Sequence, residues 1–136
     1  MIANYLAVGS MELAIERTVA YLRERVVFGK PLAESQHIQF ELAELVAELD
    51  LVRHYNYACA AAYLRGEDTT RFATIAKLVV PRLARRVADT CLQFHGGWGY
   101  IEDYRIARAW RDQRLLRIGG GTTETMKYYV AKLLGL

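Results

Sequence analysis

Residues 93–100 read QFHGGWGY and lie at the end of a long helical pattern. Three glycines within four positions end a helix and let nearby backbone approach a ligand. The helix that they end begins near Asp68 or Thr69, since either residue can cap it. Pro81 lies within the pattern and cannot donate a backbone hydrogen bond, so we expect a kink there or a helix that restarts. The apolar residues of this helix recur at steps of four: Ile75, Val79, Leu83, Val87 and Cys91.

Two long helical patterns precede this one. The first runs over residues 6–26 and is stopped by Gly29 and Pro31. The second runs from about Ser35 to Leu64, has an alanine-rich end that permits close packing, and is terminated by Gly66. Each carries one apolar stripe at helical spacing: Met11, Ile15, Val19, Leu22 and Val26 in the first, and Ile38, Leu42, Leu45, Leu49 and Val52 in the second.

Two shorter helices are predicted after residue 100. One lies around residues 104–113, and the other begins after Gly121 and runs to the C-terminus. Thr122 or Thr123 can cap the last helix, and Glu124 suits the positive end of its dipole. No strand with convincing period-two alternation competes with these helices. The pattern therefore predicts an all-α fold, an antiparallel four-helix-type bundle with an additional short helix, as one domain over residues 1–136.

Composition restricts the class of protein. The chain of 136 residues is 53% hydrophobic and has two prolines, which favours one globular domain with a core over a disordered chain. Its net charge of +3 is spread over helices, so solvated faces are favoured over a nucleic-acid surface. No apolar run reaches the roughly 20 residues of a membrane span. Cys59 and Cys91 lack metal-ligand or disulfide-framework spacing, so we expect buried thiols and a soluble, reducing compartment.

The residues alone indicate no self-contained active site, since no catalytic triad, metal cluster or Walker-type loop is present. Glu41, Glu44 and Glu48 lie at helical spacing, which is typical of a hydrated face. His95 is more typical of a structural hydrogen-bonding group than of a base. The glycines at 119–121 open onto a helix N-terminus that could receive a phosphate. Glu124 already offsets that dipole, so a flexible connector is an equal alternative.

Three further segments accompany residues 93–100. RVVFGKPL at 25–32, followed by Gln36, lies upstream, while RD at 111–112 and IGGGTTE at 118–124 lie downstream. In this order and spacing the chain resembles the C-terminal helical domain of the acyl-CoA dehydrogenase family over nearly its whole length. The resemblance implies an N-terminal helical domain and a middle β domain elsewhere, with flavin at domain and subunit interfaces. The chain also enters its first helical pattern without a strong cap, which fits a naturally short protein or a truncated one; the resemblance favours a fragment of a larger three-domain protein.

The resemblance assigns FAD contacts to three segments. Arg25 could pair with the FAD pyrophosphate, and glutamine amides could hydrogen-bond polar edges of the cofactor. Glycine lets the protein backbone come close to it. Without the resemblance, Arg25 reads as a surface residue, Phe28 as core and Gln36 as a near-cap residue. The implied cofactor-binding residues are Arg25, Phe28, Gln36, Gln93, Gly97, Thr122 and Glu124.

The family's catalytic glutamate has no counterpart in this chain. Many members carry it immediately before Gly-Thr, where this chain has Gly120. The Gly-Gly-Thr loop is similar to that of the long-chain and isovaleryl branch, in which the base would fall just before Met1. We therefore expect no catalytic residue and no metal site within the chain.

The resemblance implies an FAD-dependent α,β-dehydrogenation of an acyl-CoA thioester, with this chain inactive alone. Implied partners are an electron-transfer flavoprotein or similar acceptor and further copies of the chain, as a homotetramer or homodimer, with no nucleic acid and no membrane span. The implied compartment is a bacterial cytoplasm or a mitochondrial matrix. Alternatives are a non-catalytic helical assembly module, a related flavoenzyme such as an acyl-CoA oxidase or nitroalkane-oxidising enzyme, and an amphipathic bundle unrelated to flavin.

Overall fold

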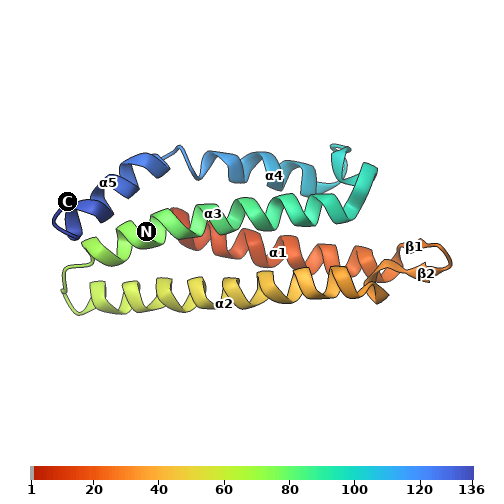
Figure 1. Cartoon of the computed structure of the whole chain (residues 1–136), viewed down its shortest axis with the longest axis horizontal. Helices are drawn as coiled ribbons and strands as arrows, with labels where there is room; N and C mark the ends of the chain where they lie inside the picture. Colours follow the sequence, from red (N-terminus) through yellow and green to blue (C-terminus); the bar gives the residue numbers. More distant parts are fainter. Residues whose placement is uncertain (1) are drawn as a thin grey trace.

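The computed structural model describes residues 2–136 as an elongated bundle of helices (Figure 1). Helix α2 runs antiparallel to α1 and α3, which run in the same direction, and α4 and α5 follow one another back along α3. The all-α prediction is thereby confirmed, with α4 and α5 sharing the fourth position of the bundle. The elements are α1 (Ile2–Glu24), β1 (Val26–Val27), β2 (Lys30–Pro31), the 3₁₀ helix η1 (Leu32–Glu34), α2 (Gln36–Leu64), α3 (Thr70–His95), the 3₁₀ helix η2 (Gly96–Tyr100), α4 (Arg105–Leu115) and α5 (Thr123–Leu133).

Helix α3 is the centre of the bundle and contacts all four other α-helices. The predicted stripes supply its core, because Met11, Leu45 and Val87 are fully buried where α1, α2 and α3 meet. Burying a side chain of this size contributes roughly 1.5–3 kcal/mol, so the three stripes provide much of the driving force for packing. Both predicted buried thiols are also confirmed, since Cys59 and Cys91 lie inside the bundle.

Helix α3 runs through Pro81 without a break, so the alternative of a restarting helix is wrong. Pro81 cannot donate to the carbonyl of Lys77 one turn earlier, which removes one helical hydrogen bond. The proline ring is buried between neighbouring helices. Packing on several sides therefore holds the helix continuous where the local sequence favours an interruption.

The first helix ends two residues earlier than predicted, and a small hairpin follows it. Val26 was expected on the helical stripe but pairs with Pro31 in an antiparallel ladder, and it is largely exposed. Phe28 and Gly29 form the turn with φ angles of 52° and 80°, the left-handed region that two-residue hairpins require. Strands of two residues are too short to show alternation, so this segment carries no strand signal that a pattern could detect.

Helix ends are held largely as predicted. The Asp68 carboxylate accepts from Thr70 N at 2.9 Å and from Thr70 Oγ1 at 2.6 Å, which fixes the start of α3. The Thr122 hydroxyl accepts from Thr125 N at 3.3 Å and caps α5. The last helix ends at Leu133 rather than at the C-terminal residue.

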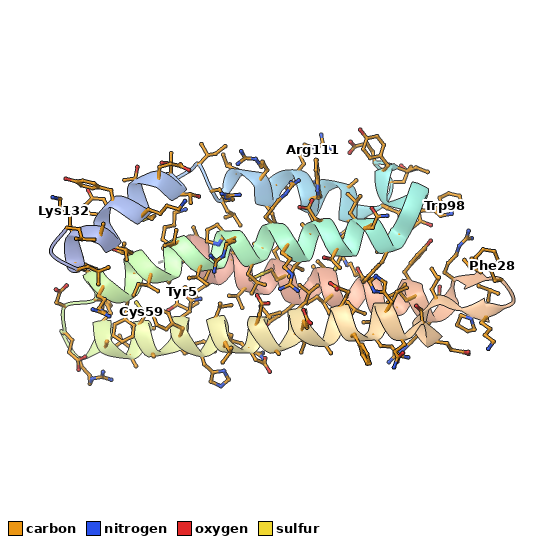
Figure 2. All side chains as sticks on the ribbon, viewed as in Figure 1. Tyr5, Phe28, Cys59, Trp98, Arg111 and Lys132 are labelled. Atoms are coloured by element: carbon orange, nitrogen blue, oxygen red, sulfur yellow. The ribbon has the colours of Figure 1, made fainter. Side chains whose placement is uncertain are left out.

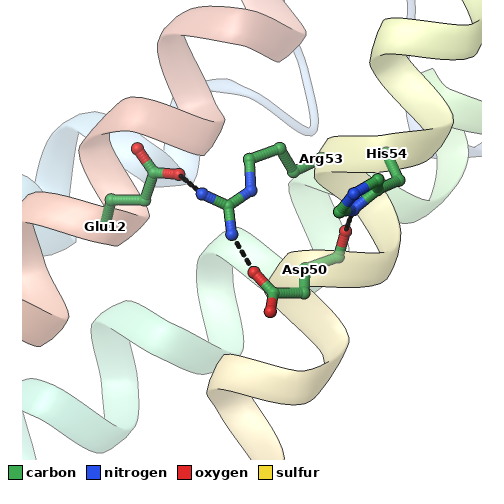
Figure 3. Close-up of polar contacts among 4 residues, drawn as sticks. All are labelled: Glu12, Asp50, Arg53 and His54. Atoms are coloured by element: carbon green, nitrogen blue, oxygen red, sulfur yellow. Dashed lines mark hydrogen bonds and ion pairs between the residues drawn. The ribbon is translucent and has the colours of Figure 1, made fainter.

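Surface ion pairs join the long helices. Arg53 of α2 donates to Glu12 of α1 at 3.1 Å and also bonds Asp50, while His54 Nδ1 lies 2.8 Å from the Asp50 carbonyl (Figure 3). Between α2 and α3, Arg86 bonds Glu44 at 2.8 Å and also Glu48. Exposed pairs of this kind contribute about 0–1 kcal/mol each, so they orient the helices more than they stabilise them.

Candidate flavin cleft

A cleft of about 740 Å³ opens where α1 and α3 end beside the start of α2. Arg25 reaches it from the end of α1, and Gln93 and Gly97 reach it from the exit of α3. Ser35 and His37, which sequence reasoning did not single out, line the opposite wall. Residues separated by about seventy positions therefore meet at one end of the bundle.

The glycine exit shapes this cleft. Gly96 has φ 58° and ψ −139°, a conformation that only glycine adopts readily, and it turns the chain directly after His95. A Cβ on Gly96 or Gly97 would meet nothing within 4 Å, so their backbone faces open space. At Gly99 a Cβ would lie 2.6 Å from the Leu92 carbonyl oxygen. The third glycine is therefore required for chain packing, and the first two leave backbone accessible to a ligand.

His95 forms the floor between the cleft and the core. Its side chain is 5% exposed, and Nδ1 lies 2.7 Å from the Cys91 carbonyl oxygen. Because that carbonyl can only accept, Nδ1 carries the hydrogen. The imidazole stacks on the Tyr21 ring with centroids 4.3 Å apart, and the Tyr21 hydroxyl donates to the His95 carbonyl at 3.3 Å. These contacts favour the interpretation of His95 as a structural group.

Arg25 supplies the cleft with an available positive charge. The side chain is exposed and makes no ion pair with any carboxylate in residues 2–136. A guanidinium beside open glycine backbone and a glutamine amide forms a donor-rich surface, which suits phosphate oxygens and other anionic acceptors.

Four of the seven predicted contact residues lie outside the cleft lining, and two of these four, Phe28 and Gln36, lie at the cleft end of the bundle. Phe28 is 102% exposed at the hairpin tip, so the alternative that it belongs to the core is wrong. Figure 2 shows it at the same end of the bundle as Trp98 and far from Lys132. Gln36 is the first residue of α2 and is exposed near the cleft wall.

Thr122 and Glu124 lie much farther along the bundle. The loop before them is bonded to Lys77, which precedes Gln93 by sixteen residues on α3. At a rise of 1.5 Å per residue, the two groups of predicted contacts are separated by about 24 Å along the helix axis. The structure therefore places Arg25, Gln93 and Gly97 together and Thr122 with Glu124 elsewhere.

Glu124 sits at the N-terminus of α5. A hydrogen bond from its own backbone N–H lowers the pKa of this carboxyl, and the Thr122 hydroxyl, Lys127 and Arg117 add to the effect. A negative charge held at that position already compensates the helix dipole. The geometry therefore favours a connecting loop over a phosphate site at residues 119–121.

Other kinds of site receive no support from the described residues. Residues 2–136 contain no cluster of three or more His, Cys, Asp or Glu side chains arranged to hold a metal ion. Within the same range, none of the helices combines the length and apolar character needed to cross a bilayer.

Comparison with known proteins gives one consistent result. Residues 2–135 match the model of the acyl-CoA dehydrogenase C-terminal domain. A probable acyl-CoA dehydrogenase of Bacillus subtilis (strain 168) is 38% identical over 131 residues, which are 95% of this chain and 34% of that protein. The mitochondrial long-chain specific acyl-CoA dehydrogenase of Sus scrofa is 39% identical over 127 residues, which are 93% of this chain and 30% of that protein.

A solved structure agrees with these sequence matches. The acyl-CoA dehydrogenase of Geobacillus kaustophilus superposes with a TM-score of 0.96 at 35% identity, over 99% of this chain and 36% of that one. The chain thus spans about a third of the length of the relatives that it matches. The family match, the relatives and the bundle geometry agree, and the chain belongs to the acyl-CoA dehydrogenase family as its C-terminal helical domain.

Proposed function

We propose that this chain is the FAD-contacting and oligomerising domain of an enzyme that dehydrogenates an acyl-CoA thioester between its α and β carbons. The observation that carries the proposal is the convergence of Arg25, Gln93 and Gly97 on one cleft. Family membership supplies the reaction class and the cofactor, and the cleft supplies residues that suit that cofactor.

The donor set fits the polar parts of FAD. Arg25 offers a guanidinium that forms no ion pair within residues 2–136 and suits a pyrophosphate. Gln93 offers an exposed amide for a polar edge, and Gly97 offers open backbone. The rigid floor of His95 and Tyr21 keeps these groups in place before a ligand binds, which lowers the entropic cost of binding. When bound, FAD supplies the acceptor for the substrate's β hydrogen.

The cleft and the Thr122–Glu124 segment are separated by about 24 Å along α3, which supports a flavin site built from more than one part of the protein. We infer that the cleft and the Thr122–Glu124 segment face different parts of a flavin site, or flavins bound by different subunits. Such sharing needs more than one copy of the chain, as in a homotetramer or homodimer. Exposed apolar side chains on α2, such as Phe40, Leu51 and Tyr57, provide a surface for such contacts.

Proton removal is assigned outside this chain. Gly120 has no side chain, so residue 120 cannot act as the base. The long-chain and isovaleryl branch, whose base would precede Met1, is therefore our proposed subgroup. The complete enzyme would pass electrons to an electron-transfer flavoprotein or similar acceptor, in a bacterial cytoplasm or a mitochondrial matrix.

FAD titration of the purified chain tests the cleft directly. We expect binding by calorimetry that weakens about tenfold in Arg25→Ala, since one charge-assisted contact is lost. Gln93→Ala should weaken binding by a smaller factor. Arg23→Ala is the matched control, because Arg23 is an exposed arginine two residues earlier that does not line the cleft. Equal affinity in all four proteins would refute the cleft assignment.

A second candidate function is a non-catalytic assembly module, which the exposed apolar residues of α2 favour. It predicts a defined oligomer by light scattering with no visible flavin absorption and no FAD binding. Bound FAD in the natively purified protein would contradict this alternative.

A further inference from the structure

The segment between α4 and α5, residues 116–122, is called the glycine loop below. Its own hydrogen bonds are local: Ile118 N and Gly119 N donate to the Leu115 carbonyl at 2.9 and 2.8 Å, and Thr123 N donates to the Arg117 carbonyl at 3.2 Å. Gly120 and Gly121 have φ angles of 67° and 111°, so the chain here has no side chain to anchor it. Local bonds alone leave the loop free to move as a unit relative to α3.

The space beneath the loop is hollow. Gly119 and Gly120 line a cavity of about 370 Å³ together with Asn4 of α1 and Lys77 of α3. Leu116 at the start of the loop packs against the core, but Gly119 and Gly120 have no side chains that could pack, so the position of the loop's middle depends on directional bonds.

Lys77 makes those bonds. Its Nζ donates to the Leu116 carbonyl and to the Gly119 carbonyl, both at 2.8 Å, across 39 and 42 residues of sequence. Leu116 follows the last residue of α4 as its C-cap, where the carbonyl end of the helix dipole is negative. One ammonium group thus ties the end of α4 and the middle of the glycine loop to the central helix.

The ammonium is held without a carboxylate. Lys77 forms no ion pair within residues 2–136, and no acidic side chain lines the cavity. Burial lowers the pKa of the Lys77 amine, as expected for a charge removed from water without a counter-ion. An apolar side chain would avoid this desolvation, so the distinct contribution of lysine is its pair of directed hydrogen bonds.

Asn4 of α1 adds a further polar side chain to the lining of this cavity. Its side chain is 3% exposed and has no hydrogen-bond partner in residues 2–136. Lys77 has a third N–H that neither carbonyl uses. Both groups line the same cavity, so α1, α3 and the glycine loop all present polar atoms there.

We propose that Lys77 is a positioning residue that fixes the glycine loop, and with it Gly120 and the Thr122 cap of α5, against α3. Its functional consequence rests on the proposed function, because this loop carries Thr122 and leads directly into Glu124 of α5, both of which are proposed FAD contacts. The fixation of the glycine loop by Lys77 does not depend on flavin, and it is tested without flavin.

Amide hydrogen exchange on the purified chain measures the fixation. In Lys77→Met the amides of Ile118, Gly119 and Thr123 should exchange about tenfold faster, since their local opening no longer breaks two charge-assisted bonds. The amides of Leu49 and Val87 in the core should keep wild-type protection. The urea midpoint should also stay near the wild-type value, since the lost bonds are offset by relief of desolvation.

Two further variants complete the test. Lys77→Arg keeps the charge and the donors, so it should restore most of the protection. Lys127→Met removes the same charge from an exposed site on α5 and should change loop exchange less than twofold, by about the effect of a surface substitution. Unchanged protection in Lys77→Met, or equal loss in Lys77→Met and Lys77→Arg, would overturn the proposal. Failure of FAD to bind would leave this result standing and would count only against the proposed function.

Discussion

The two ends of α3 hold their loops in different ways. At the cleft end, a glycine turn rests on a stacked histidine and tyrosine and on its own backbone, with Gly99 against Leu92. At the other end, Leu116 packs on the core, while the glycines of the loop lie over a cavity and the loop's middle is joined to the central helix by Lys77. Two glycine-rich segments of similar composition are therefore held mainly by packing at one end of α3 and mainly by directed hydrogen bonds from one ammonium group at the other.

The largest expected effect comes from Gly99→Ala at the cleft end. The new Cβ would lie 2.6 Å from a backbone oxygen that cannot rotate away, so we expect a loss of about 2–3 kcal/mol in the free energy of unfolding. Gly97→Ala is the control, since its Cβ would meet nothing within 4 Å. Urea unfolding of both variants measures the difference, and equal midpoints would contradict the packed-turn account.

Alkaline pH should lower the free energy of unfolding through Cys91, a buried residue in the part of α3 near the cleft. Burial raises the pKa of this thiol in the folded state, although a hydrogen bond with Thr18 partly opposes the shift. The folded pKa exceeds the unfolded value, so the stabilisation is complete below pH 9.0 and is lost as pH rises through the folded pKa. The slope from this group approaches about 1.4 kcal/mol per pH unit.

Cys91→Ala removes that component of the slope. Urea unfolding of wild type and variant from about pH 7 to about pH 10, a range that brackets the ordinary thiol pKa, compares the two pH dependences. The tyrosines and Cys59 with raised pKa values are present in both proteins and cancel in the difference. If the free energy of unfolding changed with pH in the same way in wild type and in Cys91→Ala, the result would contradict a buried neutral thiol at this position.

A smaller effect is expected in the glycine loop from Gly120→Ala. Its φ of 67° costs an L-residue roughly 1 kcal/mol, while the site is sterically open. Gly119→Ala lacks a positive φ and meets only ordinary contacts, so it should change the unfolding free energy by less. Thermal unfolding of the pair would contradict this account if Gly119→Ala were the more damaging change.

The smallest expected effect is at the surface pair of Arg53 with Glu12. Arg53→Ala should cost about 0–1 kcal/mol, and added salt should reduce the difference from wild type. Because this pair lies on α1 and α2, the variant should leave cleft and loop unchanged (Figure 3). A loss above about 2 kcal/mol in urea unfolding would show that the pair is more than a surface contact.

Much of the fold was predictable because helical periodicity is a local signal. Apolar steps of three and four marked α1, α2 and α3, and glycines marked their ends. The hairpin was not predictable, since two paired residues on each side leave no alternation. Continuity through Pro81 was not predictable either, because packing from other helices decides it.

The candidate site was predictable only in part. The resemblance identified Arg25, Gln93 and Gly97, and the structure brings these three to one cleft. It gave no sign that Thr122 and Glu124 lie at another level of the bundle. Lys77 was missed because its partners are backbone carbonyls 39 and 42 residues away, which leave no mark on the sequence.

The most direct measurement of the central claim is the amide NMR spectrum of the isotope-labelled chain during addition of FAD. The account predicts that the amides of Arg25, Gln93 and Gly97 shift first and saturate together, and that Arg25→Ala weakens this response. Shifts confined to other surfaces, or no shifts as FAD is added in large excess over the protein, would contradict the assignment of this cleft to flavin.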